Sequence, residues 1–447
     1  MTRPYRVCTR CVMDTSAEDI VFDEAGVCSH CTAFLARHPL GAVDDSALAR
    51  RRDALHAAIR SAGERKPYDC IVGVSGGADS SYALYLAVKN GLRPLAVHLD
   101  NGWNAELAQN NIANLVRGLG VDLVTHVIEW REYRELMEAF FVADVIDVEL
   151  LYDNAMLAVN FEQADRFSVK AILGGTNVAT EGMRMPPGWN WFKYDKRNIR
   201  SISRRFGGPR LDSFPAIGTI DYIRHHLAGV RWHSFLNHLD FRKNEALAVL
   251  QRDHGYKPYP FKHYESVFTR FYQGFILPTK FGIDKRRLHH STLIMSGEMT
   301  RSEALENLRH FPYESDKLLR RDRRYFLKKM RWDEAMLGAY LRRPAVPHDA
   351  YPSEQGLWNL ALKAYRLVGL SGSGAAGVFR DPNLLSIPDE EHSEAEERWL
   401  TMGLDESGNL LVISHIFKHP NADACQIRII SARKASKKEE EQYEEGI

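Results

Sequence analysis

Short apolar strands alternate with amphipathic helices over the segment from Asp69 to Gly175. Strands are expected at residues 69–75, 94–100, 121–129 and 169–175, and helices at residues 79–91, 104–119, 130–143 and 154–167. This alternation is typical of a parallel sheet with helices on both faces. The predicted fold class is therefore α/β with a doubly wound parallel sheet, and a ligand is expected at the carboxyl ends of its strands.

Length and charge indicate more than one domain. A chain of 447 residues is too long for a single core, and its apolar (45%) and charged (26%) fractions exclude collagen, coiled coil and general disorder. The formal net charge of +1 makes nucleic-acid binding unlikely as a main function. Residues 371–447 nevertheless hold 8 basic and 15 acidic side chains, which predicts a separate acidic C-terminal unit.

The N-terminus has no apolar stretch of the signal-peptide kind, and no apolar run is long enough for a transmembrane helix. Four of the six cysteines lie within the first 31 residues, in two C-x-x-C pairs. This pattern indicates a metal site in a reducing compartment rather than a disulfide scaffold. We therefore expect a cytoplasmic protein without membrane insertion.

The segment VSGGADSS (74–81) lies between the first predicted strand and its helix. Gly76 and Gly77 allow backbone N–H groups to face a ligand, and the helix start favours negative charge. The segment lacks the lysine and the length of a Walker A loop. It resembles the PP-loop of ATP pyrophosphatases, which holds the β- and γ-phosphates while the α-phosphate is attacked. A plain strand–turn–helix with glycines for tight packing is the alternative.

Two further strand ends are expected at the same edge, HLDNGWN (98–104) and GGTNVATEG (174–182). The predicted ATP and pyrophosphate contacts are Ser75, Gly76, Gly77, Asp79, Ser80, Ser81, Asp100, Gly175, Thr176 and Asn177. Asp79 and Glu181 are candidate ligands of the Mg²⁺ that accompanies ATP, although Asp79 could instead complement the helix N-terminus.

Cys8 and Cys11 are separated by sixteen residues from Cys28 and Cys31. This spacing predicts a tetrahedral Cys₄ zinc site, and four thiolates make its role structural. A redox C-x-x-C pair is the alternative. The remaining two cysteines, Cys70 and Cys425, are expected to be packed thiols.

Together, C-T-R-C-V-M-D-T, D-E-A-G-V-C-S-H-C, V-S-G-G-A-D-S-S, H-L-D-N-G-W-N and G-G-T-N resemble the N-acetyl sugar amidotransferases of bacterial surface-polysaccharide biosynthesis. The resemblance continues through residues 280–305 and 347–358 and covers about residues 5–365. It implies that ATP adenylates the N-acetyl oxygen of a nucleotide-activated sugar. Ammonia then displaces AMP and gives an acetamidino group, as in lipopolysaccharide O-antigen synthesis.

Cationic side chains at the sheet edge would offset the developing phosphate charge. The candidates are Lys193, Lys196, Lys280, Lys285, Arg286 and Arg287, with Lys280 and Asp79 taken as catalytic. His289 and His290 are neighbours, so on a helix at most one is expected to face the pocket. The chain has no glutaminase motif of its own, so the resemblance implies a separate glutaminase subunit that supplies ammonia.

Residues 375–446 resemble the BrnT ribonuclease toxins, which have a small RelE-like fold. The opening segment of that family is missing, so a degenerate fragment is expected, with Arg428 and Arg433 as its only RNA-facing candidates. A solvated acidic extension without function is the alternative. A third view takes the whole chain as an antitoxin-binding module led by this tail.

Four parts are therefore predicted: a zinc-binding module (1–40), a PP-loop, HUP-like domain (45–235), a mainly helical substrate or partner region (236–369), and a linker with a small α+β fragment (370–447). The runner-up function is a tRNA-modifying PP-loop enzyme. Basic residues that would form its RNA face are Arg320–Arg324, Lys328, Lys329 and Arg331.

Overall fold

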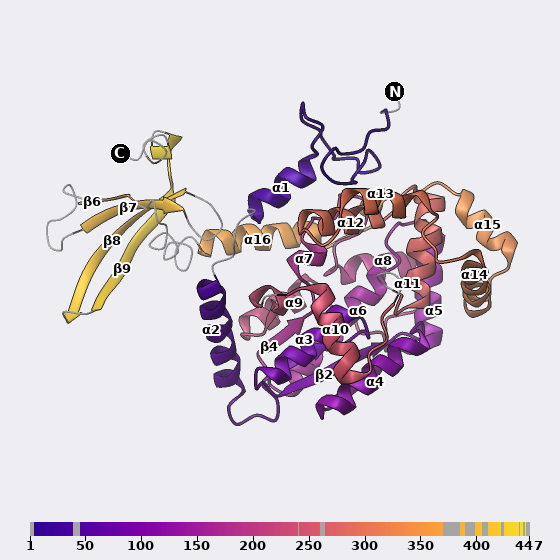
Figure 1. The fold of residues 1–447 in the computed structure, drawn as a ribbon, viewed down its shortest axis with the longest axis horizontal. Coiled ribbons are helices and arrows are strands. Elements are labelled where there is room, and N and C mark those ends of the chain that lie inside the picture. Colours follow the sequence, from indigo (N-terminus) through magenta and orange to yellow (C-terminus); the bar gives the residue numbers. More distant parts are fainter. Residues whose placement is uncertain are drawn as a thin grey trace. The chain divides into compact units, whose positions relative to one another are not determined.

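The computed structural model describes residues 4–38, 45–239, 241–259, 264–369, 385–388, 398–404, 410–421, 424–437, 439–440 and 443. It divides into two compact units, residues 1–354 and 355–447, each of which is a body of its own (Figure 1). Among the helices within these described ranges, none combines the length and apolar character needed to cross a bilayer.

The first unit is built on a parallel five-stranded sheet with the order β3-β2-β1-β4-β5. Its strands are β1 (Cys70–Gly73), β2 (Pro94–Asp100), β3 (Leu123–Val127), β4 (Ala171–Gly174) and β5 (Arg231–Ser234). The chain leaves β1 toward β2 on one side, whereas β4 pairs with β1 on the other. The strand order therefore reverses between β1 and β4, and the crevice at their carboxyl ends is the place where such sheets bind ligands.

Alternate residues of the strands enter two separate hydrophobic layers. Ile71, Leu95 and Ile172 pack with α5 (Trp130–Val142), α6 (Leu150–Arg166) and α8 (Lys196–Arg205). Val72 and Leu173 pack instead with α2 (Asp45–Gly63), α3 (Ala78–Lys89), α4 (Glu106–Leu119) and α10 (Lys243–His254). Both faces of the sheet are thus covered by helices, as a parallel sheet requires, and the predicted doubly wound fold is confirmed.

The region from 182 to 235 contains α8, α9 (Thr219–Leu227) and the edge strand β5. The sequence of β5, RWHS, has no apolar alternation, so the strand is recognised only from its pairing with β4 in the folded structure. The mainly helical region beyond it is as expected. Its elements are η1 (Phe235–His238), α10, α11 (Val267–Phe271), the π-helix η2 (Tyr272–Phe281), α12 (Arg286–Met295), α13 (Arg301–Arg309), α14 (Asp316–Met330), α15 (Glu334–Arg342) and η3 (His348–Ala350).

The second unit begins with α16 (Gln355–Gly369) and continues as an antiparallel sheet in the order β6-β7-β8-β9. Its strands are β6 (Leu385–Pro388), β7 (Arg398–Leu404), β8 (Leu410–Asn421) and β9 (Ala424–Lys434). Leu411 and Ile413 are the buried centre of this small sheet. Arg433 pairs with Glu439 at 2.6 Å, whereas the side chains of Arg428 and Cys425 lie outside the described residues.

Candidate functional site

The loop between β1 and α3 is shaped by its glycines. Gly76 has φ +83°, a conformation that L side chains rarely adopt, and a Cβ there would lie 2.8 Å from the Ala108 carbonyl oxygen. Gly77 is the N-cap of α3 and offers no side chain to the first N–H groups of the helix. The start of α3 therefore keeps the amide donors and the positive helix end that suit an anion.

Serine hydroxyls line this loop from the inside. The Ser75 and Ser80 Oγ atoms lie 3.2 Å apart, and the Gly77 N–H donates to Ser75 Oγ at 3.3 Å. Ser75 also lines the cavity described below. Ser81, by contrast, lies in the first turn of α3 with its side chain fully buried, so the structure does not bring its hydroxyl to the cavity.

Two tyrosines donate hydrogen bonds to the backbone of this loop, and no sequence motif had indicated them. The hydroxyls of Tyr256 and Tyr259 both donate to the Gly76 carbonyl oxygen at 3.2 Å. Burial raises the pKa of both phenols, so they remain protonated donors. Their hydroxyls fix the direction of the Gly76 carbonyl and so help to hold the shape of the loop.

The loop after β4 packs directly against the loop after β1. A Cβ on Gly175 would lie 2.6 Å from the Ser80 nitrogen, so only glycine permits this approach. Asn177 is buried and caps the short helix α7 (Val178–Glu181) by accepting from the Thr180 N–H at 2.8 Å. Thr180 Oγ1 donates to Asp79 Oδ2 at 3.1 Å and so joins the two loops. Thr176 is exposed beside them.

The end of β2 completes the same edge. Asp100 accepts from the Gly102 N–H at 2.8 Å and from Asn104 Nδ2 at 3.1 Å. His98, which sequence analysis did not select, is buried, with Nδ1 2.8 Å from the Val74 carbonyl oxygen and Nε2 3.0 Å from Asn104. Burial lowers the pKa of His98, so a neutral ring ties β2 to the loop.

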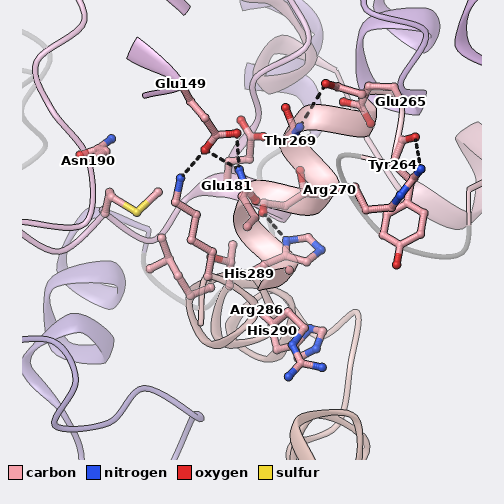
Figure 2. Close-up of a pocket in the computed structure, with 18 of the residues that line it drawn as sticks. Glu149, Glu181, Asn190, Tyr264, Glu265, Thr269, Arg270, Arg286, His289 and His290 are labelled. Atoms are coloured by element: carbon pink, nitrogen blue, oxygen red, sulfur yellow. Dashed lines mark hydrogen bonds and ion pairs between the residues drawn. The ribbon is translucent and has the colours of Figure 1, made fainter. Parts of the chain in front are cut away.

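A cavity of about 780 Å³ opens at this edge (Figure 2). Ser75, Asn101 and Asn104 bound it on the side of the sheet, and Thr180 and Glu181 bound it from α7. Much of the remaining wall comes from the segment between Tyr264 and Pro312. Glu265 of this segment comes close to the loop, because a Cβ on Gly77 would lie 3.5 Å from its Oε1. Sequence analysis missed Glu265, which no motif contained.

Each of the cations predicted to meet phosphate is paired with a carboxylate. The pairs are Lys193–Asp147 (2.5 Å), Lys193–Asp153 (2.8 Å), Lys196–Asp221 (3.4 Å), Lys280–Asp144 (2.9 Å), Lys285–Glu149 (2.9 Å), Arg286–Asp284 (2.6 Å) and Arg287–Asp14 (2.9 Å). Of these six predicted cations, Lys193, Lys285 and Arg286 line the cavity. Burial acts to lower the pKa of Lys193, but the neighbouring carboxylates of Asp147 and Asp153 outweigh it and raise that pKa. Burial raises the pKa of Asp153.

Lys280 is not at the site. Its ammonium donates to Asp144 at 2.9 Å and to the carbonyl oxygens of Tyr340 and Arg343, both at 2.7 Å, and its side chain is completely buried. All three donors are used within the fold, and Lys280 does not line the cavity. The catalytic role predicted for Lys280 therefore has no geometric basis.

Both histidines of α12 line the cavity, so the expectation that at most one would do so is wrong (Figure 2). Successive helical residues are about 100° apart, and a cavity that lies broadly along a helix reaches both of them. His289 Nδ1 lies 3.3 Å from the Thr180 carbonyl oxygen. His290 is buried, and burial together with the nearby Arg286 lowers its pKa to about 4.

The four N-terminal cysteines form one cluster. Their sulfur atoms all lie within 4.8 Å of one another, with Cys8–Cys31 at 4.0 Å and Cys11–Cys28 at 3.7 Å. A tetrahedral ion bound at about 2.3 Å by four sulfurs spaces them by about 3.8 Å, so the cluster fits such an ion. Cys70 lies apart from the cluster in β1, fully buried, and burial raises the pKa of its thiol.

Two family models match adjacent segments in the C-terminal half of the chain. Residues 265–365 match the family model "LPS biosynthesis protein WbpG-like, C-terminal domain", and residues 365–439 match "Ribonuclease toxin, BrnT, of type II toxin-antitoxin system". No curated protein matches the chain.

Among solved structures, NMN synthetase from Francisella tularensis is 16% identical, with a TM-score of 0.26, over 48% of this chain and 99% of that one. NH3-dependent NAD synthetase from Campylobacter jejuni is 14% identical, with a TM-score of 0.25, over the same shares of the two chains. The segment that forms much of the cavity wall thus matches the model of a WbpG-like C-terminal domain of LPS biosynthesis proteins, and a segment that matches the BrnT model follows it in the same chain.

Proposed function

We propose that this protein is an ATP-dependent amidotransferase that converts the N-acetyl group of a nucleotide-activated sugar into an acetamidino group. One observation carries the proposal: a single cavity joins the loop at Ser75 to the WbpG-like segment that begins at residue 265. A volume of about 780 Å³ has room for a nucleotide together with a second substrate. The WbpG-like match supports a sugar of lipopolysaccharide as that second substrate.

The proposed first step is adenylation. The amide oxygen of the sugar attacks the α-phosphorus of ATP, the bond to the β-phosphate oxygen breaks, and pyrophosphate leaves. The N–H groups at Gly77 and the start of α3, with the Ser75 and Ser80 hydroxyls, would hold that pyrophosphate. Asp79 and Glu181 would offer carboxylate oxygens to Mg²⁺, the ligand type that this ion prefers; bound there, it would offset phosphate charge.

The proposed second step is amination. Ammonia attacks the carbon of the adenylated amide, loses a proton to solvent, and the C–O bond to AMP breaks to give the amidine. AMP is a far better leaving group than an amide oxygen, so adenylation divides one difficult substitution into two easier steps. We propose that a glutaminase subunit supplies the ammonia, because free ammonia is mostly protonated near neutral pH.

Incubation with ATP, ammonium and a panel of UDP- and CMP-linked acetamido sugars tests the reaction by mass spectrometry. The expected product is lighter by roughly one mass unit, since oxygen is replaced by NH, and it appears together with AMP and pyrophosphate. Asp79→Ala and Ser80→Ala should abolish product while the unfolding midpoint stays within a few degrees, since both residues lie at a helix start. Pyrophosphate release elicited only by tRNA would overturn the proposal.

One observation favours a second candidate, a tRNA-modifying enzyme. Six exposed basic residues recur every three or four positions on one face of α14 and at its C-terminus: Lys317, Arg320, Arg321, Arg324, Lys328 and Arg331. Such a face suits a phosphate backbone. Lys329 is not part of it, because its ammonium lies 4.2 Å from the centre of the Trp130 ring.

A further inference from the structure

The first cysteine pair is attached to the helices beside the cavity by hydrogen bonds to its backbone. Arg301, the first residue of α13, donates to the Cys8 carbonyl oxygen at 2.8 Å and to the Cys11 carbonyl oxygen at 3.0 Å. Val12 follows the pair directly, and its N–H donates to Ser291 Oγ of α12 at 3.1 Å. Arg287 of α12 donates to the Val12 carbonyl oxygen at 2.9 Å. The segment from Cys8 to Val12 is thus fixed to α12 and α13.

The cysteine cluster also shares its hydrophobic core with the cavity wall. The buried residues around the sulfurs include Met13, Ile20 and Phe34 from the N-terminal module, together with Met183 and Leu288. Met183 and Leu288 line the cavity as well. The module and the cavity wall therefore share one hydrophobic core, and a bound ion would add a further constraint on the shape of the module.

From α12 the contacts continue to the loop after β1. α12 packs on α7, and His289 Nδ1 lies 3.3 Å from the Thr180 carbonyl oxygen. Thr180 Oγ1 in turn donates to Asp79 Oδ2 at 3.1 Å, in the first turn of α3. An unbroken series of hydrogen bonds and packed helices thus connects the cysteine backbone with the proposed ATP loop.

We infer that the four-cysteine module positions the ATP loop through α13 and α12, which pack on each other, with Arg301 of α13 as the positioning residue that transmits the shape of the metal-bound turn. This inference rests on the proposed function only in naming ATP as the ligand of the loop. A bound ion fixes the Cys8 and Cys11 carbonyls as acceptors for one guanidinium. Without the ion the acceptors separate, α13 and the α12 helix packed on it lose their support, and α7 no longer holds Asp79.

The test compares Arg301→Ala with Arg309→Ala in the full chain. Arg309 lies at the other end of α13, is exposed, and pairs with Glu306 of the same helix. Arg301→Ala is expected to keep its zinc, measured by elemental analysis, yet to bind ATP on the order of ten-fold more weakly. Amide exchange should rise at residues 178–181 and 286–295 and stay unchanged in the central strands. Arg301→Lys, which reaches one carbonyl at a time, should recover part of the loss, and Arg309→Ala should match the wild type.

A second experiment separates positioning from general destabilisation. Removal of the ion with a chelator should raise exchange at residues 178–181 in the wild type but add little in Arg301→Ala, because both changes break the same connection. Ser291→Ala replaces Arg301→Ala if the latter loses its ion. Unchanged exchange at 178–181 in the ion-loaded variant, or an equal rise over the whole unit, would overturn the inference. If the wild type binds no ATP, the proposed function fails, while the exchange data still decide this inference.

Discussion

At the scale of single residues, Gly175 shows why two strand ends meet in one site. A Cβ there would lie 2.6 Å from the Ser80 nitrogen and 2.7 Å from the Asp79 carbonyl carbon, and neither backbone atom can move without displacing the start of α3. The two loops can therefore lie this close only because residue 175 has no side chain. A side chain there would displace the amide groups at the start of α3.

Gly175→Ala should weaken ATP binding at least ten-fold and cost about 1–3 kcal/mol of stability, the usual penalty of overpacking. Calorimetric titration with ATP and urea denaturation measure the two effects. Gly356→Ala is the matched control, because its Cβ meets nothing within 4 Å. Equal ATP affinity in both variants would refute this role for Gly175.

Lys280 illustrates a residue whose chemistry was misjudged from sequence. Because its ammonium satisfies Asp144 and two carbonyl oxygens, Lys280→Met should cost about 3 kcal/mol of unfolding free energy. Denaturant titration measures this loss, and the turnover of the folded fraction should equal that of the wild type. A stable variant without turnover would restore Lys280 as a catalytic residue.

His348 makes the fold sensitive to acid. Its Nε2 accepts from the Asp147 N–H at 3.1 Å and its Nδ1 lies 2.9 Å from Asn198 Oδ1, which requires the neutral ring. Burial lowers the pKa of His348 to about 4 from the usual 6.5, so the unfolded chain binds the proton more readily. The stabilisation by the neutral His348 ring is fully present above pH 6.5. It is lost as the pH falls toward 4, which lowers the free energy of unfolding by up to about 3 kcal/mol.

Urea denaturation from pH 7 to pH 4 measures the acid sensitivity. His348→Gln should be less stable than the wild type at pH 7 and should lose less stability on acidification. Parallel pH curves for the two proteins would show that other groups cause the acid loss.

At the scale of elements, strands β1, β2 and β4 could be predicted because they are buried apolar runs that end in turn residues. β5 could not, since its sequence RWHS shows no apolar pattern and its pairing with β4 depends on tertiary contact. For the same reason the motifs indicated the loop at Ser75 but not Tyr256 or Tyr259, and HLDNGWN contained His98 without indicating its role. These side chains act through hydrogen bonds from elements that are distant in sequence.

The outer face of α14 offers a prediction at this scale. Arg320→Glu, Arg324→Glu and Lys328→Glu together should change stability by less than about 1 kcal/mol, since all three side chains are exposed. Sugar-dependent pyrophosphate release should stay at the wild-type rate, as a coupled phosphate assay would measure. Loss of a tRNA-dependent release in this variant would instead support the second candidate function.

At the scale of the molecule, length and the uneven charge indicated a separate C-terminal part, and the structure divides at Glu354 into two compact units. The four domain boundaries drawn from sequence remain predictions. A chain ending at Gly369 should keep the unfolding midpoint of the first unit and its sugar-dependent activity. Differential scanning calorimetry and the mass-spectrometric assay measure both, and loss of activity in a folded truncation would assign a role to the BrnT-type segment.

The shared cavity also limits when the protein can first bind the proposed nucleotide. Ser75 and Pro312 both border the cavity, although more than half of the chain lies between these two residues. A ribosome must therefore have released nearly the whole first unit before the pocket has both of its walls. A nascent chain that carries only the glycine-rich turn lacks the enclosed cavity, so under the proposed function no reactive adenylate would form on an unfinished protein.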